Sequence, residues 1–161
     1  MVQFTNDDLH EADALMRAIE RELPGIVTTS GSSDWFLFYD PDGVTDPAKR
    51  FPFATIVTGD RYDAASHLDR DQRTYRVNIG IDRAAYKQLF GSAPRQPAGY
   101  DVIDSGFDYT DIDTVLPHPL YAPLHWVCVV NPAERTRGQL AELLEGAHAQ
   151  ARRQYDNQHP G

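Results

Sequence analysis

Residues 116–151, LPHPLYAPLHWVCVVNPAERTRGQLAELLEGAHAQA, contain a proline-rich loop, a short apolar run and a helical pattern in one continuous stretch. The run Trp126–Val130 has the length and β-branched content of a strand. Thr136 and Gln139 are spaced as a capping box that would open the following helix. Its apolar positions recur on one helical face: Leu140, Leu143, Leu144, Ala147 and Ala151. The stretch predicts a surface loop held by a strand and a terminal helix.

Upstream, the chain predicts a helix followed by four strands. The helix has apolar residues at Leu9, Ala12, Met16, Ile19 and Leu23. Thr5 and Asp8 form a capping-box pattern at its start, and Pro24-Gly25 ends it. Short β-branched and aromatic runs then predict strands over residues 26–29, 35–40, 53–58 and 75–79.

A second helix and a long connection complete the order α-β-β-β-β-α-loop-β-α. The helix is expected from an Asp82 cap to Gly91 as its C′ residue. Residues 92–124 form the connection, with a short extended piece expected around Tyr100 to Ile103. Loops of this length inside a compact domain are more often functional than idle.

These elements predict an α+β two-layer sandwich, with a mainly antiparallel sheet and helices on one face. We expect a single domain over residues 1–155 and a short tail over 156–161. The strand Trp35–Tyr39 is apolar or aromatic at every position, so both of its faces are expected to be covered. The sheet face without helices is therefore expected to meet the long loop, a ligand or a second copy of the chain.

The composition is that of a soluble globular domain: 161 residues, 41% hydrophobic and 24% charged. The acidic N-terminus does not resemble a signal peptide, and no apolar run approaches the ~20 residues that span a bilayer. We expect a cytoplasmic protein with no membrane partner. Cys128 is the one cysteine, so no internal disulfide forms, and we interpret it as a small core residue.

The net charge of −9 disfavours nucleic acid as a partner, because such binding relies on Lys and Arg neutralising phosphates. Residues 96–134 contain six acidic residues and no basic one. Residues 49–95 hold the local excess of positive charge, with its densest cluster at Arg70, Arg73, Arg76 and Arg83. Only a patch formed by this cluster could reverse the expectation.

The succession YRVNIGIDRAAYKQLFG, a long acidic loop, PHPLYAPLHWVCVV and a terminal helix resembles the MmcQ/YjbR superfamily, and more closely a group of uncharacterised actinobacterial proteins. The resemblance covers roughly residues 50 to 155, and its matching positions are Pro119, Tyr121, His125 and Trp126. It implies an α-β-β-β-α-β-β-α two-layer sandwich of the frataxin-like and secretion-chaperone-like kind. The wider family is often labelled DNA-binding, but this chain lacks a basic last third.

The proline-pinned His118 is the best candidate for a catalytic group. Pro117 and Pro119 fix the backbone on both sides of it, and a preorganised imidazole suits a general base or a ligand contact. The alternative is a histidine packed on Tyr121 to close the loop. His125 and Trp126 complete the cluster, with His125 also interpretable as a strand-end residue whose ring is hydrogen bonded.

Arg76 and Asn78 project from the sheet face opposite Tyr75, Val77 and Ile79. A guanidinium beside an amide could grip a carboxylate or a phosphate. The alternative is that the arginines pair with nearby acids: Asp60, Asp63, Asp69 and Asp71. The sequence does not decide whether Arg76 and His118 share one cavity.

No cofactor and no metal site is predicted. Asp104, Asp108, Asp111 and Asp113 lie within ten residues, but their spacing matches no calcium loop, and we interpret them as solvated loop charge. Ser66, His67 and Asp69 have the residue types of a hydrolase triad, but they lie too close along the chain to be aligned as one.

Two functions remain as hypotheses. The first is a non-enzymatic binding module that recognises a small molecule or a protein partner through the open sheet face and the 100–126 loop. Its expected contacts are Arg76, Asn78, His118, Tyr121, His125 and Trp126. The second is a small enzyme with His118 as base and Tyr121, Arg76 or Asp113 nearby. Nucleic-acid binding is third, and a homodimer through the open face is compatible with all three.

Overall fold

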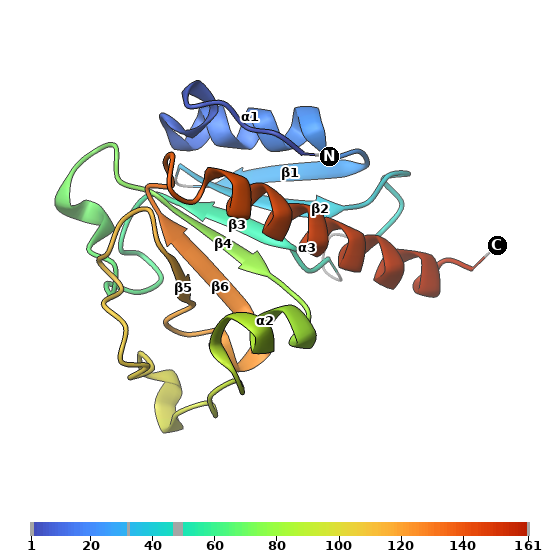
Figure 1. The fold of residues 1–161 in the computed structure, drawn as a ribbon. Helices are drawn as coiled ribbons and strands as arrows, with labels where there is room; N and C mark the ends of the chain where they lie inside the picture. The colour runs from blue at the N-terminus through green and yellow to red at the C-terminus, as the bar shows by residue number, and fades with distance from the viewer. Residues whose placement is uncertain (1, 32, 47–49, 161) are drawn as a thin grey trace.

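A six-stranded antiparallel sheet forms the centre of the computed structural model, which describes residues 2–31, 33–46 and 50–160. The spatial order is β1-β2-β3-β4-β6-β5 (Figure 1). The strands are β1 (Ile26–Gly31), β2 (Asp34–Tyr39), β3 (Ala54–Val57), β4 (Arg76–Gly80), β5 (Val115–Pro117) and β6 (Trp126–Val130). The predicted α+β class with a mainly antiparallel sheet is confirmed.

Helices α1 (Ala12–Glu22) and α3 (Arg137–Gln158) cover one face of this sheet (Figure 1). α2 (Arg83–Phe90) follows β4 directly, and its N-terminus is capped as predicted, because Asp82 Oδ1 accepts from the Ala85 amide at 2.7 Å. The core between helices and sheet is formed by apolar side chains such as Leu15, Ile19, Leu37, Ile56, Val77, Ile79, Leu140 and Leu144. α3 continues to Gln158, beyond the expected end of the domain at 155.

The first helix is shorter than its pattern predicts. Thr5 and Asp8 do make the reciprocal capping bonds, at 2.8 and 3.2 Å, but they close a single 3₁₀ turn over Asp7–Leu9. The Leu9 carbonyl then accepts from the Tyr75 hydroxyl at 2.9 Å, and the α-helix begins anew at Ala12. The tyrosine supplies a partner for Leu9 that an uninterrupted helix would have taken from its own backbone.

The connection 92–124 differs from its prediction at two places. The expected extended piece around Tyr100 to Ile103 is instead a 3₁₀ turn over Ala98–Tyr100 followed by irregular chain, and the Ile103 amide donates to the Pro119 carbonyl. β5, which the residue patterns did not predict although the family resemblance implies two strands after the second helix, forms the edge of the sheet beside β6. Pro117 argues against a strand in the sequence because proline lacks a backbone N–H, but an edge strand tolerates this loss.

Asp113, rather than the predicted Thr136–Gln139 capping box, holds the start of α3. Thr136 makes no side-chain cap bond, and the Asp113 carboxylate accepts from the backbone of residues 133, 135 and 136 at 2.9 to 3.1 Å. It also accepts from the Thr136 hydroxyl at 2.6 Å. This long-range cap ties the acidic loop to the last helix and lies outside what local spacing can indicate.

Side chains on the second face of the sheet point away from α1 and α3. In β3 and β4, Thr55, Arg76 and Asn78 alternate with core residues, so they share this face. The 58–74 loop covers part of it, because Leu68 packs on Val57 and Val130 in a small second core. The remainder of this face stays accessible and carries the candidate site.

No helix in the described part of the chain combines the length and apolar character needed to cross a membrane.

Candidate functional site

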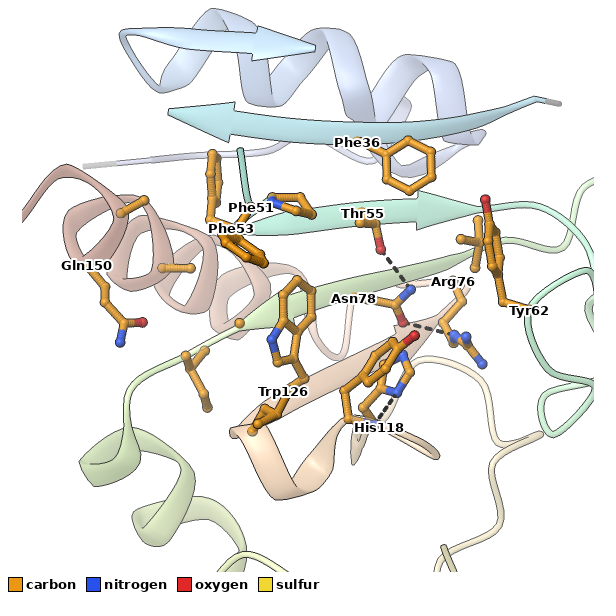
Figure 2. A pocket seen from close by; sticks show the side chains of 18 of the residues that line it. Phe36, Phe51, Phe53, Thr55, Tyr62, Arg76, Asn78, His118, Trp126 and Gln150 are labelled. Carbon is orange, nitrogen blue, oxygen red and sulfur yellow. Dashed lines mark hydrogen bonds between the residues drawn. The ribbon is translucent and has the colours of Figure 1, made fainter. Parts of the chain in front are cut away.

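A cavity of about 860 Å³ lies over β3, β4 and β6, between the 118–126 loop and the aromatic side chains of β2 and the 51–62 segment. Its walls are aromatic: Phe36, Phe51, Phe53, Tyr62, Tyr121 and Trp126. At one end it continues past Phe53 to α3, where Gln150 contributes an amide (Figure 2). The volume is within the range of small-molecule sites.

Arg76 lies buried in the floor of this cavity, 2% exposed, and pairs with Asp63. Its two terminal nitrogens donate to the Asp63 carboxylate at 3.1 and 2.8 Å, a bidentate arrangement that fits guanidinium geometry. Nη1 also donates to the Ser66 hydroxyl at 2.9 Å. Burial alone would raise the pKa of Asp63, but the bonds and charge of Arg76 outweigh it and hold that pKa below its usual value.

Asn78 extends the network from the arginine to the neighbouring strand. Its Oδ1 accepts from Arg76 Nε at 2.9 Å, and its Nδ2 donates to the Thr55 hydroxyl at 3.0 Å (Figure 2). Thr55 and Asn78 are register partners in β3 and β4, so strand pairing itself brings these groups together. The floor is therefore a rigid, hydrogen-bonded layer built on the central strands.

His118 is buried at the base of the cavity, 2% exposed, with its ring stacked on Tyr121 at 4.7 Å between centroids. Its Nδ1 accepts from the backbone amides of Leu120 and Tyr121, both at 3.0 Å. An Nδ1 that accepts fixes the neutral tautomer with hydrogen on Nε2. Burial, assisted by the charge of Arg76, lowers the pKa of His118 to about 3.

In this arrangement neither ring nitrogen of His118 has a free lone pair with which to accept a proton. The acceptor nitrogen already holds two amides, and the other nitrogen carries a hydrogen and can only donate. Cys128, on the same sheet face, is fully buried, and burial raises the pKa of its thiol to about 12. Burial thus disfavours the charged form of both side chains.

Trp126 forms a wall of the cavity because its opposite residue in β4 is Gly80. A Cβ at Gly80 would lie 2.8 Å from Cε2 of Trp126, so the indole rests directly on the β4 backbone. Tyr121 meets the indole edge to face, with 6.4 Å between ring centroids. The two rings present flat apolar surfaces above the polar floor.

The structure places His125 elsewhere. Its backbone is left-handed, with φ 68°, and its carbonyl accepts from the Ile81 amide at 3.1 Å. Its ring lies 5.6 Å from that of Tyr86 and borders a separate, smaller cavity beside α2. The other five predicted contacts, Arg76, Asn78, His118, Tyr121 and Trp126, line one cavity, so Arg76 and His118 do share it.

The lining residues that the sequence analysis did not name as contacts include Phe36, Thr55, Tyr62 and Asp63. The period-2 pattern of strand 53–58 would have placed Thr55 on the face of Asn78 once their register was known. Asp63 was one of four acids considered as partners for the arginines, and the loop that selects it has no periodic signal. Tyr62 lies in that same loop.

The arginine cluster and the Ser66, His67 and Asp69 trio make structural contacts within the protein. Arg70 donates to the carbonyls of Ser66 and Thr110 and braces the loops, so with Arg76 buried the predicted arginine cluster is not one free patch. Ser66 is buried and accepts from Arg76, which leaves no triad with His67. Within the described residues, no three His, Cys, Asp or Glu side chains converge as metal ligands would.

Together the fold and the cavity define a small α+β domain with a ligand-sized pocket on its sheet. The chain belongs to the family of unknown function DUF6194, whose model matches residues 10–160. A crystal structure of Deinococcus radiodurans protein DR2400, described with a DUF419 domain, is similar at 16% sequence identity and a TM-score of 0.46. That similarity covers 89% of this chain and 80% of the other. No curated protein matches the chain.

Proposed function

We propose that the protein binds a small molecule in the aromatic-walled cavity and catalyses no reaction on it. The observation that carries this proposal is a cavity of about 860 Å³ whose floor is a preorganised polar network and whose walls are rings. Binding sites combine apolar walls with a few fixed polar groups in this way, because the walls supply affinity and the polar groups supply orientation.

The rim of the cavity also supports a binding role. Phe51 is 88% exposed and Tyr62 52% exposed. Large apolar groups gathered around one opening mark interaction sites more often than chance exposure does. A ligand seated between them would remove this surface from water and gain free energy in proportion to the apolar area buried.

A thermal-shift screen with neutral bicyclic heteroaromatic fragments tests the proposal. A fragment present at ten times its Kd stabilises the folded state by about 1.4 kcal/mol, which raises Tm by about 3–5 °C for a chain of this size. The matched variants are Gly80→Ala, which pushes Trp126 into the cavity, and Gly146→Ala on α3, where a Cβ meets open space. Hits must survive in Gly146→Ala and disappear in Gly80→Ala; a screen in which no fragment shifts Tm contradicts the proposal.

A protein partner, or a second copy of this chain, is a separate proposal for the same face. Leu124 and Phe51 border the cavity and are 67% and 88% exposed, which is the observation that favours it. Sedimentation velocity over a range of protein concentrations tests self-association. If the protein sediments as a monomer at every concentration, and Leu124→Ser sediments in the same way, the homodimer proposal is contradicted.

We also propose, from the sequence resemblance alone, that the chain is related to the MmcQ/YjbR superfamily and to its actinobacterial members, and that it acts in the cytoplasm. The positions that carry the resemblance are Pro119, Tyr121, His125 and Trp126. Fractionation of cells that express the tagged protein tests the location.

A further inference from the structure

The charge around the cavity is balanced within the protein. Among the described residues that line it, only Asp63 and Arg76 carry a formal charge, and they face each other as a bidentate pair. The arginine is 2% exposed and also donates to Ser66 and Asn78. An anionic ligand would have to displace Asp63 or enter without a counter-charge, and an unpaired charge in such a site is costly.

Each acceptor on three side chains of the floor already receives at least one hydrogen bond from the protein. Asn78 Oδ1 accepts from Arg76, the Thr55 hydroxyl oxygen accepts from Asn78, and His118 Nδ1 accepts from two backbone amides. What these three side chains still offer is the second amide hydrogen of Asn78, the hydroxyl hydrogen of Thr55 and the Nε2 hydrogen of His118. The floor thus keeps three donor hydrogens for a ligand, from Asn78, Thr55 and His118.

The walls above this floor are flat. Tyr121 stacks on the His118 ring with 26° between the ring planes, and the Trp126 indole rests on the backbone at Gly80. In Figure 2, Asn78 and His118 lie between Trp126 on one side and Arg76 on the other, and Arg76 lies toward Tyr62. A planar ring can slide between the aromatic faces and bring one edge to the donors.

We propose that the ligand is an uncharged, planar ring compound whose edge carries hydrogen-bond acceptors, such as a carbonyl oxygen. This inference rests on the proposed function and names the class of ligand. An acceptor edge pairs with the donors of Asn78, Thr55 and His118. A ring that carries only donors leaves those groups facing donors, and each buried donor left unpaired costs affinity.

Three probes of similar size separate these chemistries: chromone, which has acceptors only, indole, which has a donor only, and 2-naphthoate, which is an anion. Each is titrated into uniformly ¹⁵N-labelled protein, and the Asn78 side-chain amide is followed for a saturable shift. We expect chromone to bind about tenfold more tightly than indole and 2-naphthoate, the effect of one lost hydrogen bond. The Asn78 signals should move with chromone and stay in place with Gly80→Ala protein.

The variant Asn78→Asp replaces the donating amide by a carboxylate oxygen of the same shape. This variant should bind chromone about tenfold more weakly than the unmodified protein does, and its affinity for indole should not fall. If this variant does not fold, the comparison of the three probes on the unmodified protein decides. Indole or 2-naphthoate binding in the cavity as tightly as chromone overturns the ligand class and leaves the proposed function intact. If no probe shifts any cavity signal, the proposed function fails and this inference with it.

Discussion

Gly80 and Trp126 face each other across β4 and β6, and the indole occupies the space where any larger residue would place its Cβ. The distance from that Cβ position to Trp126 Cε2 is 2.8 Å, shorter than real contacts allow. The glycine therefore sets the position of the indole, and the indole sets the width of the cavity. The absence of a side chain at Gly80 in β4 therefore determines the shape of the cavity at the neighbouring strand β6.

Replacing Gly80 by alanine should move the Trp126 ring into the cavity. We expect a destabilisation of about 1–3 kcal/mol, because overpacked side chains leave their preferred rotamers. ¹⁹F NMR of 5-fluorotryptophan-labelled protein resolves the ring movement, since the signal of Trp126 should shift while that of Trp35 does not. Gly146→Ala is the control and should stabilise α3 by about 0.5–1 kcal/mol. An unmoved Trp126 signal in Gly80→Ala would contradict the packing described.

The Asp63–Arg76 pair should be essential to the fold. Asp63→Asn leaves the arginine charge buried without a counter-ion, and the free energy of unfolding should fall by about 3–5 kcal/mol. Urea denaturation followed by circular dichroism measures this change. The exposed pair of Arg17 and Glu11, at 4.0 Å, supplies the control, and Arg17→Gln should cost less than about 1 kcal/mol. Equal effects of the two substitutions would refute the buried network.

His118 should make the protein less stable as the pH falls. Its folded pKa of about 3 lies below the usual 6.5, so the unfolded chain takes up a proton first. The contribution of neutral His118 to the free energy of unfolding is complete above about pH 6.5. It declines by up to about 1.4 kcal/mol per pH unit between pH 6 and 3. His118→Asn keeps an acceptor for the backbone amides of residues 120 and 121 and does not titrate.

Urea unfolding of the unmodified protein and of His118→Asn at pH 7, 6 and 5 isolates the contribution of His118 to stability. The unmodified protein should lose more stability per pH unit than His118→Asn. Long-range ¹H–¹⁵N spectra should show a neutral ring with hydrogen on Nε2 at pH 5. Identical pH slopes, or a protonated ring at pH 5, would be incompatible with the contacts of Nδ1.

The cap formed by Asp113 should stabilise the start of α3 in a pH-dependent way. Burial alone would raise the pKa of Asp113, but its bonds to Thr136 and to backbone amides lower it. The stabilisation is therefore present above the unfolded pKa and is lost as the pH falls through the lower, folded pKa. Asp113→Asn should cost about 1–2 kcal/mol at pH 7 and progressively less as the pH falls through the lowered pKa of Asp113.

Asp111→Asn on the same exposed loop is the matched control, and it should change stability by less than about 0.5 kcal/mol. Hydrogen exchange of the first turn of α3 provides a local readout. Faster exchange in Asp113→Asn than in Asp111→Asn is expected. If both variants exchange at the same rate, the cap contributes nothing.

The sequence predicted the features that depend on local period and on capping at close range. The stripe of α3, the placement of Val77 and Ile79 in the core on one face of β4, and the Asp82 cap of α2 were confirmed, because each follows from residues a few positions apart. Features that depend on distant partners were missed. The Tyr75 hydroxyl ends the first turn at Leu9, and Asp113 caps α3 from 23 residues away.

The site divides in the same way. Arg76 and Asn78 were placed on the open face by strand alternation, and His118 was selected by its two flanking prolines. The sequence did not indicate which acidic residue pairs with Arg76, because Asp63 lies in a loop without periodicity. The chemistry of His118 was also not readable, since its tautomer depends on the turn formed by residues 120 and 121.

The central claim is that the cavity on the sheet receives a small planar molecule beside Trp126. The most direct test is a titration of 5-fluorotryptophan-labelled protein with chromone, followed by ¹⁹F NMR. We expect the Trp126 signal to shift to saturation while the Trp35 signal stays fixed, and we expect Gly80→Ala to abolish the shift. Two tryptophan signals that move together without saturation, or that do not move at all, would contradict the claim.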